Sequence, residues 1–367
     1  MNKQINDNVT DLQKNDNASF NMKSRIWLSL AFIAIAALSI WAVTSQIADF
    51  SFKSLFYFVK SSNPVWLITA LLSAFGFIIF EAFALLYICN SFGFKNKLRH
   101  AFVYSASDIY FSAITPSATG GQPASAYFMI KSGISGAMTT AILIANLMMY
   151  TLVLVFLGFV VIILSPSTLI SFSTPSIVLI VIGFVVQAAL LFFFVMLFMK
   201  PALLHKLCIA TIKLLAKIKL IRKVEQKLEK LERWIGDYTE DTNKLKGKHK
   251  MFLIVFIFNL LQRLAQILVT PLTALATGCS FSEAYELFIS QIYVFLGSNC
   301  VPIPGAMGVT DALMIDSFKN NGIANPEFLE LFSRSLSFYL CVIVCGITVV
   351  LSLYSLSKRR KKDDRCL

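Results

Sequence analysis

Several charged and amide side chains of this sequence lie inside long apolar segments, where hydrocarbon could not solvate them. Arg263 stands near the middle of one such segment, in the run NLLQRLAQ, with Gln262 and Gln266 beside it. Glu81 and Asp108 lie in two other apolar segments. An arginine at the centre of a bilayer costs at least about 2.5–3.5 kcal/mol on insertion scales. These side chains are therefore expected to face a polar cavity or one another.

Asp311, Asp316 and Arg334 are further charges in apolar surroundings, towards the end of the chain. Together with the first group they suit the binding of a lipid headgroup, because a guanidinium binds phosphate and carboxylates bind other polar headgroup atoms. Free N–H groups at helix N-termini would strengthen a phosphate site. The structural alternative is that Arg263 pairs with Glu81 or Asp108 only to fix helix packing, and that Arg334 extends to the membrane interface. Both interpretations stay open at this stage.

The motifs of the common enzyme classes are absent. The sequence contains no GxSxG, no HExxH, no P-loop and no GxGxxG that opens a helix after a strand. Its three histidines lie scattered in basic loops and its seven cysteines show no CxxC spacing, so no metal and no cofactor is expected. Thr115, Ser117 and Thr119 have no neighbouring histidine, and hydroxyls at a helix break more often satisfy freed backbone groups. No catalytic residue is predicted.

Composition indicates an all-α polytopic membrane protein. Hydrophobic residues make up 57% of the chain and charged residues only 14%, against roughly 25% charged in a soluble domain. Several apolar runs exceed the roughly 20 residues that cross a bilayer. The net charge of +13 comes from Lys and Arg in short segments beside these runs. That placement orients a membrane protein and does not form a basic face for nucleic acid.

Six full transmembrane helices are predicted. Their ranges are 26–43, 65–87, 139–164, 176–199, 251–276 and 331–356. Residues 1–24 are predicted to be a disordered cytoplasmic tail, 25–357 the transmembrane domain and 358–367 a basic cytoplasmic tail, so that both termini lie in the cytoplasm. Residues 200–250 form a basic loop with apolar residues at helical spacing, which is expected to lie flat on the inner leaflet.

Two further apolar stretches are interrupted by proline and glycine. Residues 101–130 contain ITPSATGGQP, and residues 286–318 contain VPIPGAMG. Each stretch is predicted to be a broken re-entrant hairpin of two half-helices, and the two hairpins enter from opposite sides of the membrane. The break residues are Thr115, Pro116, Gly120, Gly121 and Gln122 in the first hairpin and Pro302, Pro304, Gly305 and Gly308 in the second. An inverted repeat is a possible origin, since both breaks carry Pro-x-x-x-Gly.

The segments TPSATGGQPASAYFMIKSGIS (115–135) and NCVPIPGAMGVTDALM (299–314) resemble the lysylphosphatidylglycerol synthase transmembrane family, also called flippase-like. The resemblance extends from about residue 26 to residue 356. Larger members of the family, the bacterial multiple peptide resistance factors, carry such a membrane region fused to a cytosolic aminoacyl-transferase domain. The second motif commonly runs PxPGGxGxxE, whereas this chain has Ala306 and Asp311 in place of the second Gly and the Glu.

The resemblance implies a multi-pass protein of a bacterial cell membrane that binds or translocates a charged-headgroup phospholipid such as lysyl-phosphatidylglycerol. In that interpretation Arg263 contacts phosphate and Asp108 or Asp311 contacts a cationic headgroup, while Glu81, Gln262 and Gln266 line the same cavity. One alternative is a phosphatidylglycerol lysyltransferase, which would use lysyl-tRNA, although no loop here is long enough for a soluble aminoacyl-transferase fold. Another is a membrane scaffold that partners a separate transferase.

Overall fold

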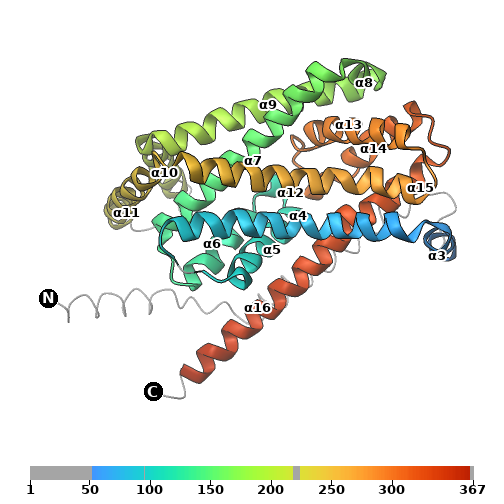
Figure 1. Cartoon of the computed structure of the whole chain (residues 1–367). Coiled ribbons are helices and arrows are strands. Elements are labelled where there is room, and N and C mark those ends of the chain that lie inside the picture. The colour runs from blue at the N-terminus through green and yellow to red at the C-terminus, as the bar shows by residue number, and fades with distance from the viewer. Residues whose placement is uncertain (1–51, 95, 218–223, 364–367) are drawn as a thin grey trace. The chain divides into compact units, whose positions relative to one another are not determined.

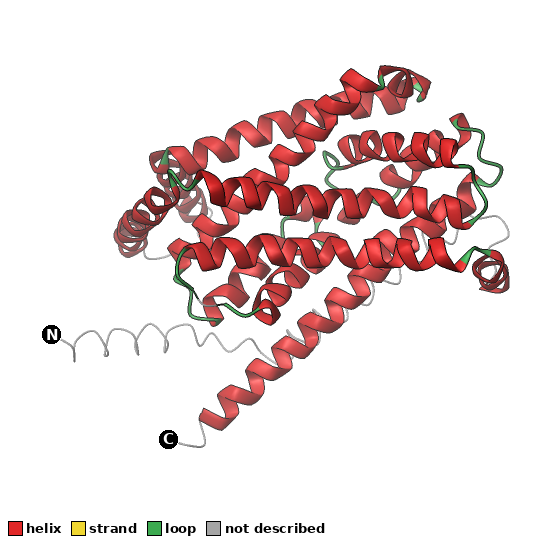
Figure 2. Cartoon of the chain, viewed as in Figure 1, coloured by secondary structure: helices red, strands yellow, loops and turns green. Residues whose placement is uncertain are grey.

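The apolar runs of the sequence fold into long helices. The structure, a computed structural model, describes residues 52–94, 96–217 and 224–363, and every element in these ranges is a helix (Figure 2). The chain divides into Met1–Phe50 and Ser51–Leu367, and all the described residues belong to the second part. The predicted tail 1–24 and the predicted first span 26–43 lie outside the described residues.

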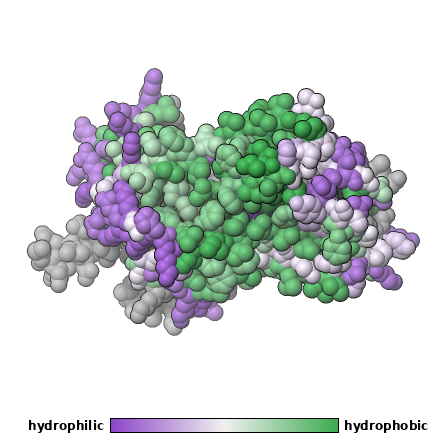
Figure 3. Space-filling view, turned by 45° about the horizontal axis from the view of Figure 1, so that its top comes forward, coloured by the Kyte–Doolittle hydropathy of each residue, from purple (hydrophilic) through white to green (hydrophobic). Residues whose placement is uncertain are grey.

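Five helical segments of the described ranges are long and apolar enough to cross a membrane. They are α4 (Pro64–Ser91), α7 (Gly136–Leu164), α9 (Thr174–Met199), α12 (His249–Ala276) and the segment Pro326–Leu356. The last segment consists of α15 (Pro326–Arg334), the π-helical η3 (Ser335–Leu340) and most of α16 (Cys341–Asp363). These five coincide with five of the six predicted spans. Hydrophobic side chains cover the middle of the helices, and hydrophilic ones gather towards their ends (Figure 3).

Contacts between α4 and α12 define two ends of the helical bundle, because the two helices run antiparallel along their whole length. At the "Asn63 end" the backbone N–H of Asn63 donates to the carbonyl of Ala276 (2.8 Å). At the "Ser91 end" Nζ of Lys248 donates to the carbonyl of Ser91 (2.6 Å). The short helices α3 (Phe52–Ser61) and α8 (Pro166–Ser171) precede α4 and link α7 to α9, respectively.

Both interrupted stretches form hairpins of two helices joined by a 3₁₀ turn. Hairpin 1 consists of α5 (Leu98–Ile114), η1 (Pro116–Ala118) and α6 (Gly121–Lys131). Hairpin 2 consists of α13 (Phe281–Ser298), η2 (Pro304–Ala306) and α14 (Val309–Asn320). Hairpin 1 packs against α4 towards its Ser91 end, whereas hairpin 2 packs against α12 towards the Asn63 end (Figure 1), and η1 contacts η2. The two hairpins therefore enter the bundle from opposite ends and meet inside it.

The two breaks begin with the same backbone conformation. Each has an extended residue before its proline and then two residues in the left-handed region. These residues are Ser117 (φ 52°) and Ala118 (φ 54°) in hairpin 1 and Gly305 (φ 60°) and Ala306 (φ 48°) in hairpin 2. Left-handed angles cost energy in residues other than glycine, so they persist only where the surroundings impose them. The segments PSATG and PGAMG thus begin with the same turn.

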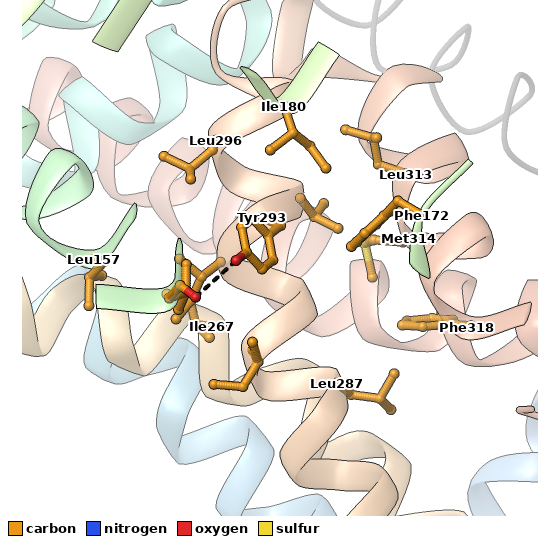
Figure 4. Packing of buried hydrophobic residues seen from close by; sticks show 14 of the residues in the cluster. Leu157, Phe172, Ile180, Ile267, Leu287, Tyr293, Leu296, Leu313, Met314 and Phe318 are labelled. Carbon is orange, nitrogen blue, oxygen red and sulfur yellow. Dashed lines mark hydrogen bonds between the residues drawn. The ribbon is translucent and has the colours of Figure 1, made fainter. Parts of the chain in front are cut away.

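Helix α13 anchors hairpin 2 in the bundle. Tyr293 is fully buried, and its hydroxyl donates to the carbonyls of Val161 (2.9 Å) and Ser165 (3.1 Å) at the end of α7. Figure 4 shows the surrounding apolar side chains, which come from α7, α9, α12, α13 and α14 and, with Phe172, from the link between α8 and α9. Gly183 of α9 allows close backbone contact, since a Cβ there would lie 1.9 Å from the carbonyl oxygen of Leu296. Small residues at such contacts are typical of helices that pack within membranes.

Residues 200–250 form two helices, α10 (Pro201–Lys217) and α11 (Val224–Leu245), which contact each other. The helical periodicity therefore predicted the helices correctly, while the position of this segment on the inner leaflet stays a prediction. Part of α11 also packs against α7. Tyr238 is fully buried, stacks on Trp234 (5.6 Å between ring centroids) and packs on Ala137 and Ala141 of α7. Part of the apolar face of α11 is thus covered by α7, whereas Leu228, Leu231 and Ile235 are only half-buried.

Replacing Tyr238 with alanine is expected to release α11 from α7. Truncating a buried aromatic side chain costs about 3 kcal/mol, which corresponds to a roughly 100-fold larger population of the undocked helix. Trypsin cleavage after Lys230 and Arg233 measures this population. Tyr354→Ala is the control, because Tyr354 is an exposed tyrosine of α16. Equal cleavage rates of α11 in the two variants would contradict the packing.

Candidate functional site

Arg263 lies near the middle of α12, and only 3% of its surface is exposed. Its guanidinium lies between two aromatic rings, 4.6 Å from the ring centroid of Tyr150 on α7 and 5.1 Å from that of Phe295 on α13. Nη1 donates to Oε1 of Gln266, while Nε is buried without a hydrogen-bond partner. No acidic side chain of the described residues forms an ion pair with Arg263. The alternative in which Arg263 pairs with Glu81 or Asp108 is therefore wrong.

Glu81 of α4 and Asp108 of α5 are both buried and lie close enough to interact with each other, so they form a carboxyl pair. Nε2 of Gln262 donates to Oε2 of Glu81 (3.1 Å), and Nε2 of Gln122 donates to Oδ2 of Asp108 (2.7 Å). Oγ of Ser112 lies 3.2 Å from Oδ1 of Asp108 and donates to it. This chain of contacts connects the break of hairpin 1, through Gln122, to Gln262 beside Arg263.

Gly121 permits the close approach of α6 to Asp108. A Cβ at this position would lie 2.0 Å from both Oδ1 of Asp108 and Oγ of Ser112. The N-terminus of α6, with its partial positive charge, thus lies against a carboxylate of the same chain. At α14 the backbone N–H of Gly308 donates to Oδ2 of Asp311 (2.8 Å). The half-helix N-termini were expected to support a phosphate, but in this structure they face these carboxylates.

Hydroxyl groups satisfy the backbone at the first break, as expected. Oγ1 of Thr115 donates to the carbonyl of Phe111 (2.6 Å) and accepts from the N–H of Gly120 (2.8 Å). Thr119 donates to the carbonyl of Pro116 (2.9 Å). Thr115 and Thr119 therefore hold the turn together.

A second charged cluster lies beside the other break. Nε of Arg334 lies 2.9 Å from Oδ1 of Asp311 and 3.9 Å from Oε1 of Glu330, and Nη2 donates to the carbonyl of Gly305 (3.4 Å). Arg334 is buried and its guanidinium lies 4.7 Å from the ring centroid of Phe338. The expectation that Arg334 extends to the interface is therefore wrong. Asp311, expected to face a cationic headgroup, already has a cation from its own chain.

Asp316 belongs to neither cluster. Its Oδ2 accepts hydrogen bonds from the backbone N–H (3.0 Å) and the hydroxyl (2.8 Å) of Ser173 at the start of α9. Its Oδ1 accepts from Nδ2 of Asn320 (3.3 Å). Asp316 thus fastens α14 to α9 near the Asn63 end.

Several residues of the site escaped the sequence analysis. Glu330 was missed, although it stands four positions before Arg334, which the sequence analysis had named, and this spacing could have revealed the two as a pair. Tyr150 and Phe295 give no such signal, because aromatic residues in an apolar segment are ordinary. The π-helical turns of η3, which follow Arg334 directly and present Phe338 to Gly305, also leave no mark in the sequence.

These features define a multi-pass helical membrane protein with two opposed, interrupted hairpins and buried charges beside both breaks. A family model described as the lysylphosphatidylglycerol synthase TM region matches residues 26–345. The chain belongs to this family, and is accordingly a lipid-related membrane protein. The comparisons with curated proteins and with solved structures found no match.

Proposed function

We propose that this protein binds a charged-headgroup phospholipid at Arg263 and carries it between the two leaflets of a cell membrane. The observation behind this proposal is the guanidinium of Arg263, which is buried inside a candidate span without a carboxylate at ion-pair distance among the described residues. A buried cation without an anion in direct contact is expensive. A lipid phosphate would provide a negative charge next to the guanidinium and an acceptor for the free Nε–H.

The aromatic neighbours of Arg263 suit this role. Tyr150 and Phe295 contact the guanidinium through their rings, which stabilises the cation without using its hydrogen-bond donors. Phe295 belongs to hairpin 2, and Gln262, next to Arg263, is connected to hairpin 1 through Glu81 and Asp108. The binding of a ligand to Arg263 would therefore depend on the positions of both hairpins.

The proposed orientation in the membrane follows from charge. Lys and Arg residues flank the helices at the Ser91 end, which we place in the cytoplasm. They include Lys97, Arg99, Lys131, Lys200, Lys248 and Lys250. Hairpin 1 is then re-entrant from the cytoplasm and hairpin 2 from the outside. Residues 116–119 at the first break are exposed, and interrupted backbone at membrane depth needs protein or water around it. We propose that headgroups pass at this level while the hairpins rock.

A headgroup with a positive charge, such as the lysyl group of lysyl-phosphatidylglycerol, would face Asp108. Of the two carboxylates expected to face it, Asp311 is paired with Arg334. Asp108 has only hydrogen bonds from uncharged side chains and its contact with Glu81. Asp108 is therefore the better partner for an ammonium group.

Arg263→Met tests the proposal in proteoliposomes. Impermeant dithionite measures the movement of fluorescent phosphatidylglycerol, and an impermeant amine reagent measures that of lysyl-phosphatidylglycerol. Losing a charged hydrogen bond to phosphate costs about 1.5–3 kcal/mol, so we expect translocation to fall at least about tenfold. Arg263→Lys should fall between the wild type and Arg263→Met, since lysine keeps the charge without the planar donors.

The matched control is Arg233→Met, which removes an exposed arginine of α11 that pairs with Glu229. It should translocate both lipids like the wild type. If Arg263→Met also retains the wild-type rate while remaining folded, Arg263 does not bind the translocated lipid. If no variant and no wild type moves either lipid, the translocation proposal fails.

A further inference from the structure

The described residues include two buried carboxyl pairs, and they differ in one respect. Each pair joins a glutamate of a candidate span to an aspartate of a hairpin: Glu81 with Asp108, and Glu330 with Asp311. The second pair has Arg334 as its cation, 2.9 Å from Asp311. The first pair has no cation at ion-pair distance among the described residues. The negative charge of Glu81 and Asp108 must therefore be balanced by something other than a neighbouring cationic side chain.

A proton provides this balance most simply. Two adjacent carboxyl groups in a buried site cannot both be ionised without a large repulsion. The hydrogen bonds around the pair give a second observation. Gln262 donates to Glu81 and Gln122 and Ser112 donate to Asp108, and all three donors are neutral side chains that supply no positive charge. A proton on one of the two carboxyl groups removes the repulsion that these donors leave.

We propose that Glu81 and Asp108 form a proton-binding site, and that the protein exchanges one proton at this site for one cationic lipid headgroup. This inference rests on the proposed function and adds its driving ion. When the ammonium group of a lipid arrives beside Asp108, the pair releases its proton and both carboxylates share the lipid cation. When the lipid leaves, a proton returns. The exchange moves one positive charge in each direction and is electrically neutral.

Few other charges act on the pair. Among the described residues, Arg263 of α12 interacts electrostatically with Glu81, and so does Cys345 of α16. The neighbouring α6 contributes the amide of Gln122, and α5 contributes the hydroxyl of Ser112. Within the described ranges, elements α7, η1, η2 and η3 present no titratable side chain that acts on the pair. The occupancy of the site thus depends chiefly on the proton, the lipid and Arg263.

The site is coupled mechanically to hairpin 1. Gln122 belongs to the break and binds Asp108 at 2.7 Å, while Gly121 lies against the same carboxylate. A change of charge on Asp108 alters the attraction of the N-terminus of α6, because an anion binds there more strongly than a neutral acid. Loading and unloading of the proton would therefore favour different positions of α6.

The test uses lysyl-phosphatidylglycerol in proteoliposomes that enclose a pH-sensitive dye. With one proton exchanged per lipid, a gradient of one pH unit should produce about a tenfold difference in lysyl-phosphatidylglycerol between the leaflets. A protonophore should abolish the difference. The isosteric variant Glu81→Gln should show no pH-driven difference, whereas Glu229→Gln, which changes an exposed glutamate of α11, should behave like the wild type.

A second measurement does not depend on lipid movement. The infrared difference spectrum of the purified protein during a pH titration should contain the carbonyl band of a protonated carboxylic acid, absent from Glu81→Gln and Asp108→Asn and kept in Glu229→Gln. A band that persists in both site variants would overturn the proton site, and so would lipid accumulation driven by sodium instead of protons. If the band behaves as expected but no lipid moves in the wild type, the proton site stands and the proposed translocation fails.

Discussion

Replacing Arg334 with methionine is expected to destabilise the folded protein by about 3–5 kcal/mol, because two buried carboxylates lose their cation. Arg334 lies 2.9 Å from Asp311 and 3.9 Å from Glu330, and both acids are buried. Acidic pH should reduce this loss of stability, since protonation neutralises the carboxylates of Asp311 and Glu330. Thermal unfolding in detergent, followed by the reaction of the buried Cys341 and Cys345 with a thiol dye, measures the effect.

Two further variants separate the ion pair from simple packing. In Arg334→Met/Asp311→Asn/Glu330→Gln the whole cluster is uncharged, and the new amide at position 311 keeps an acceptor for the N–H of Gly308. This triple variant should recover most of the lost stability, since a neutral buried cluster avoids the desolvation of charge. Arg233→Met breaks an exposed pair with Glu229 and should change stability by less than about 1 kcal/mol. A triple variant no more stable than Arg334→Met would show that the charges of this cluster do not matter.

The candidate spans could be predicted from the sequence because their signal is length. A run of apolar residues must be long enough for the hydrocarbon layer, whatever packs beside it. The predicted span 139–164 corresponds to the helix Gly136–Leu164, and the predicted span 176–199 corresponds to the helix Thr174–Met199. The first of these helices begins earlier than predicted because a polar cap extends it: Ser135 accepts a hydrogen bond from the N–H of Met138 (3.2 Å) and so starts α7.

The breaks could also be predicted, since proline and glycine interrupt a helix through their own backbone chemistry. The π-helical segment that follows Arg334 could not be predicted. The range 331–356 was expected to be one regular helix, whereas Ser335–Leu340 is π-helical. The π-helical segment places Phe338 against Gly305, where a Cβ would lie 2.4 Å from the ring. Such a tertiary contact has no signature in local sequence.

The charged residues of the site could be predicted because they stand out in apolar segments, as the spans do. The residues that they contact could not be predicted, because those contacts depend on tertiary packing. Hydrocarbon excludes charge, so an ionisable residue inside an apolar segment is conspicuous in the sequence, whereas Glu330, one residue before the predicted span 331–356, was missed. Which residue a buried charge meets depends on how deep each hairpin reaches. Hairpin 2 brings Phe295 to Arg263 and Asp311 to Arg334. That depth is set by packing such as Gly183 against Leu296, and not by any property of Arg263 itself.

Gly121→Ala is expected to open hairpin 1 and to abolish its coupling to Asp108. The new methyl group would lie 2.0 Å from Oδ1 of Asp108 and Oγ of Ser112 and 2.7 Å from the backbone oxygen of Asp108. Rotating the two side chains cannot relieve the backbone contact, so α6 must move away from α5. Overpacking of this kind costs about 1–3 kcal/mol, and it also separates Gln122 from Asp108. The lower stability should appear in thermal unfolding followed with the thiol dye. The lost contact between Gln122 and Asp108 should appear as slower lipid translocation.

Gly236→Ala provides the comparison, because it introduces the same methyl group into α11 where no atom lies within 4 Å. Alanine favours a helix interior over glycine by about 0.8–1.0 kcal/mol, so this variant should be as stable as the wild type or more stable. The two variants therefore shift stability in opposite directions if the contact between α6 and Asp108 is as tight as the structure shows. Gly121→Ala with wild-type stability and wild-type lipid translocation would mean that α6 does not rest on Asp108, and hairpin 1 would then lose its connection to the carboxyl pair.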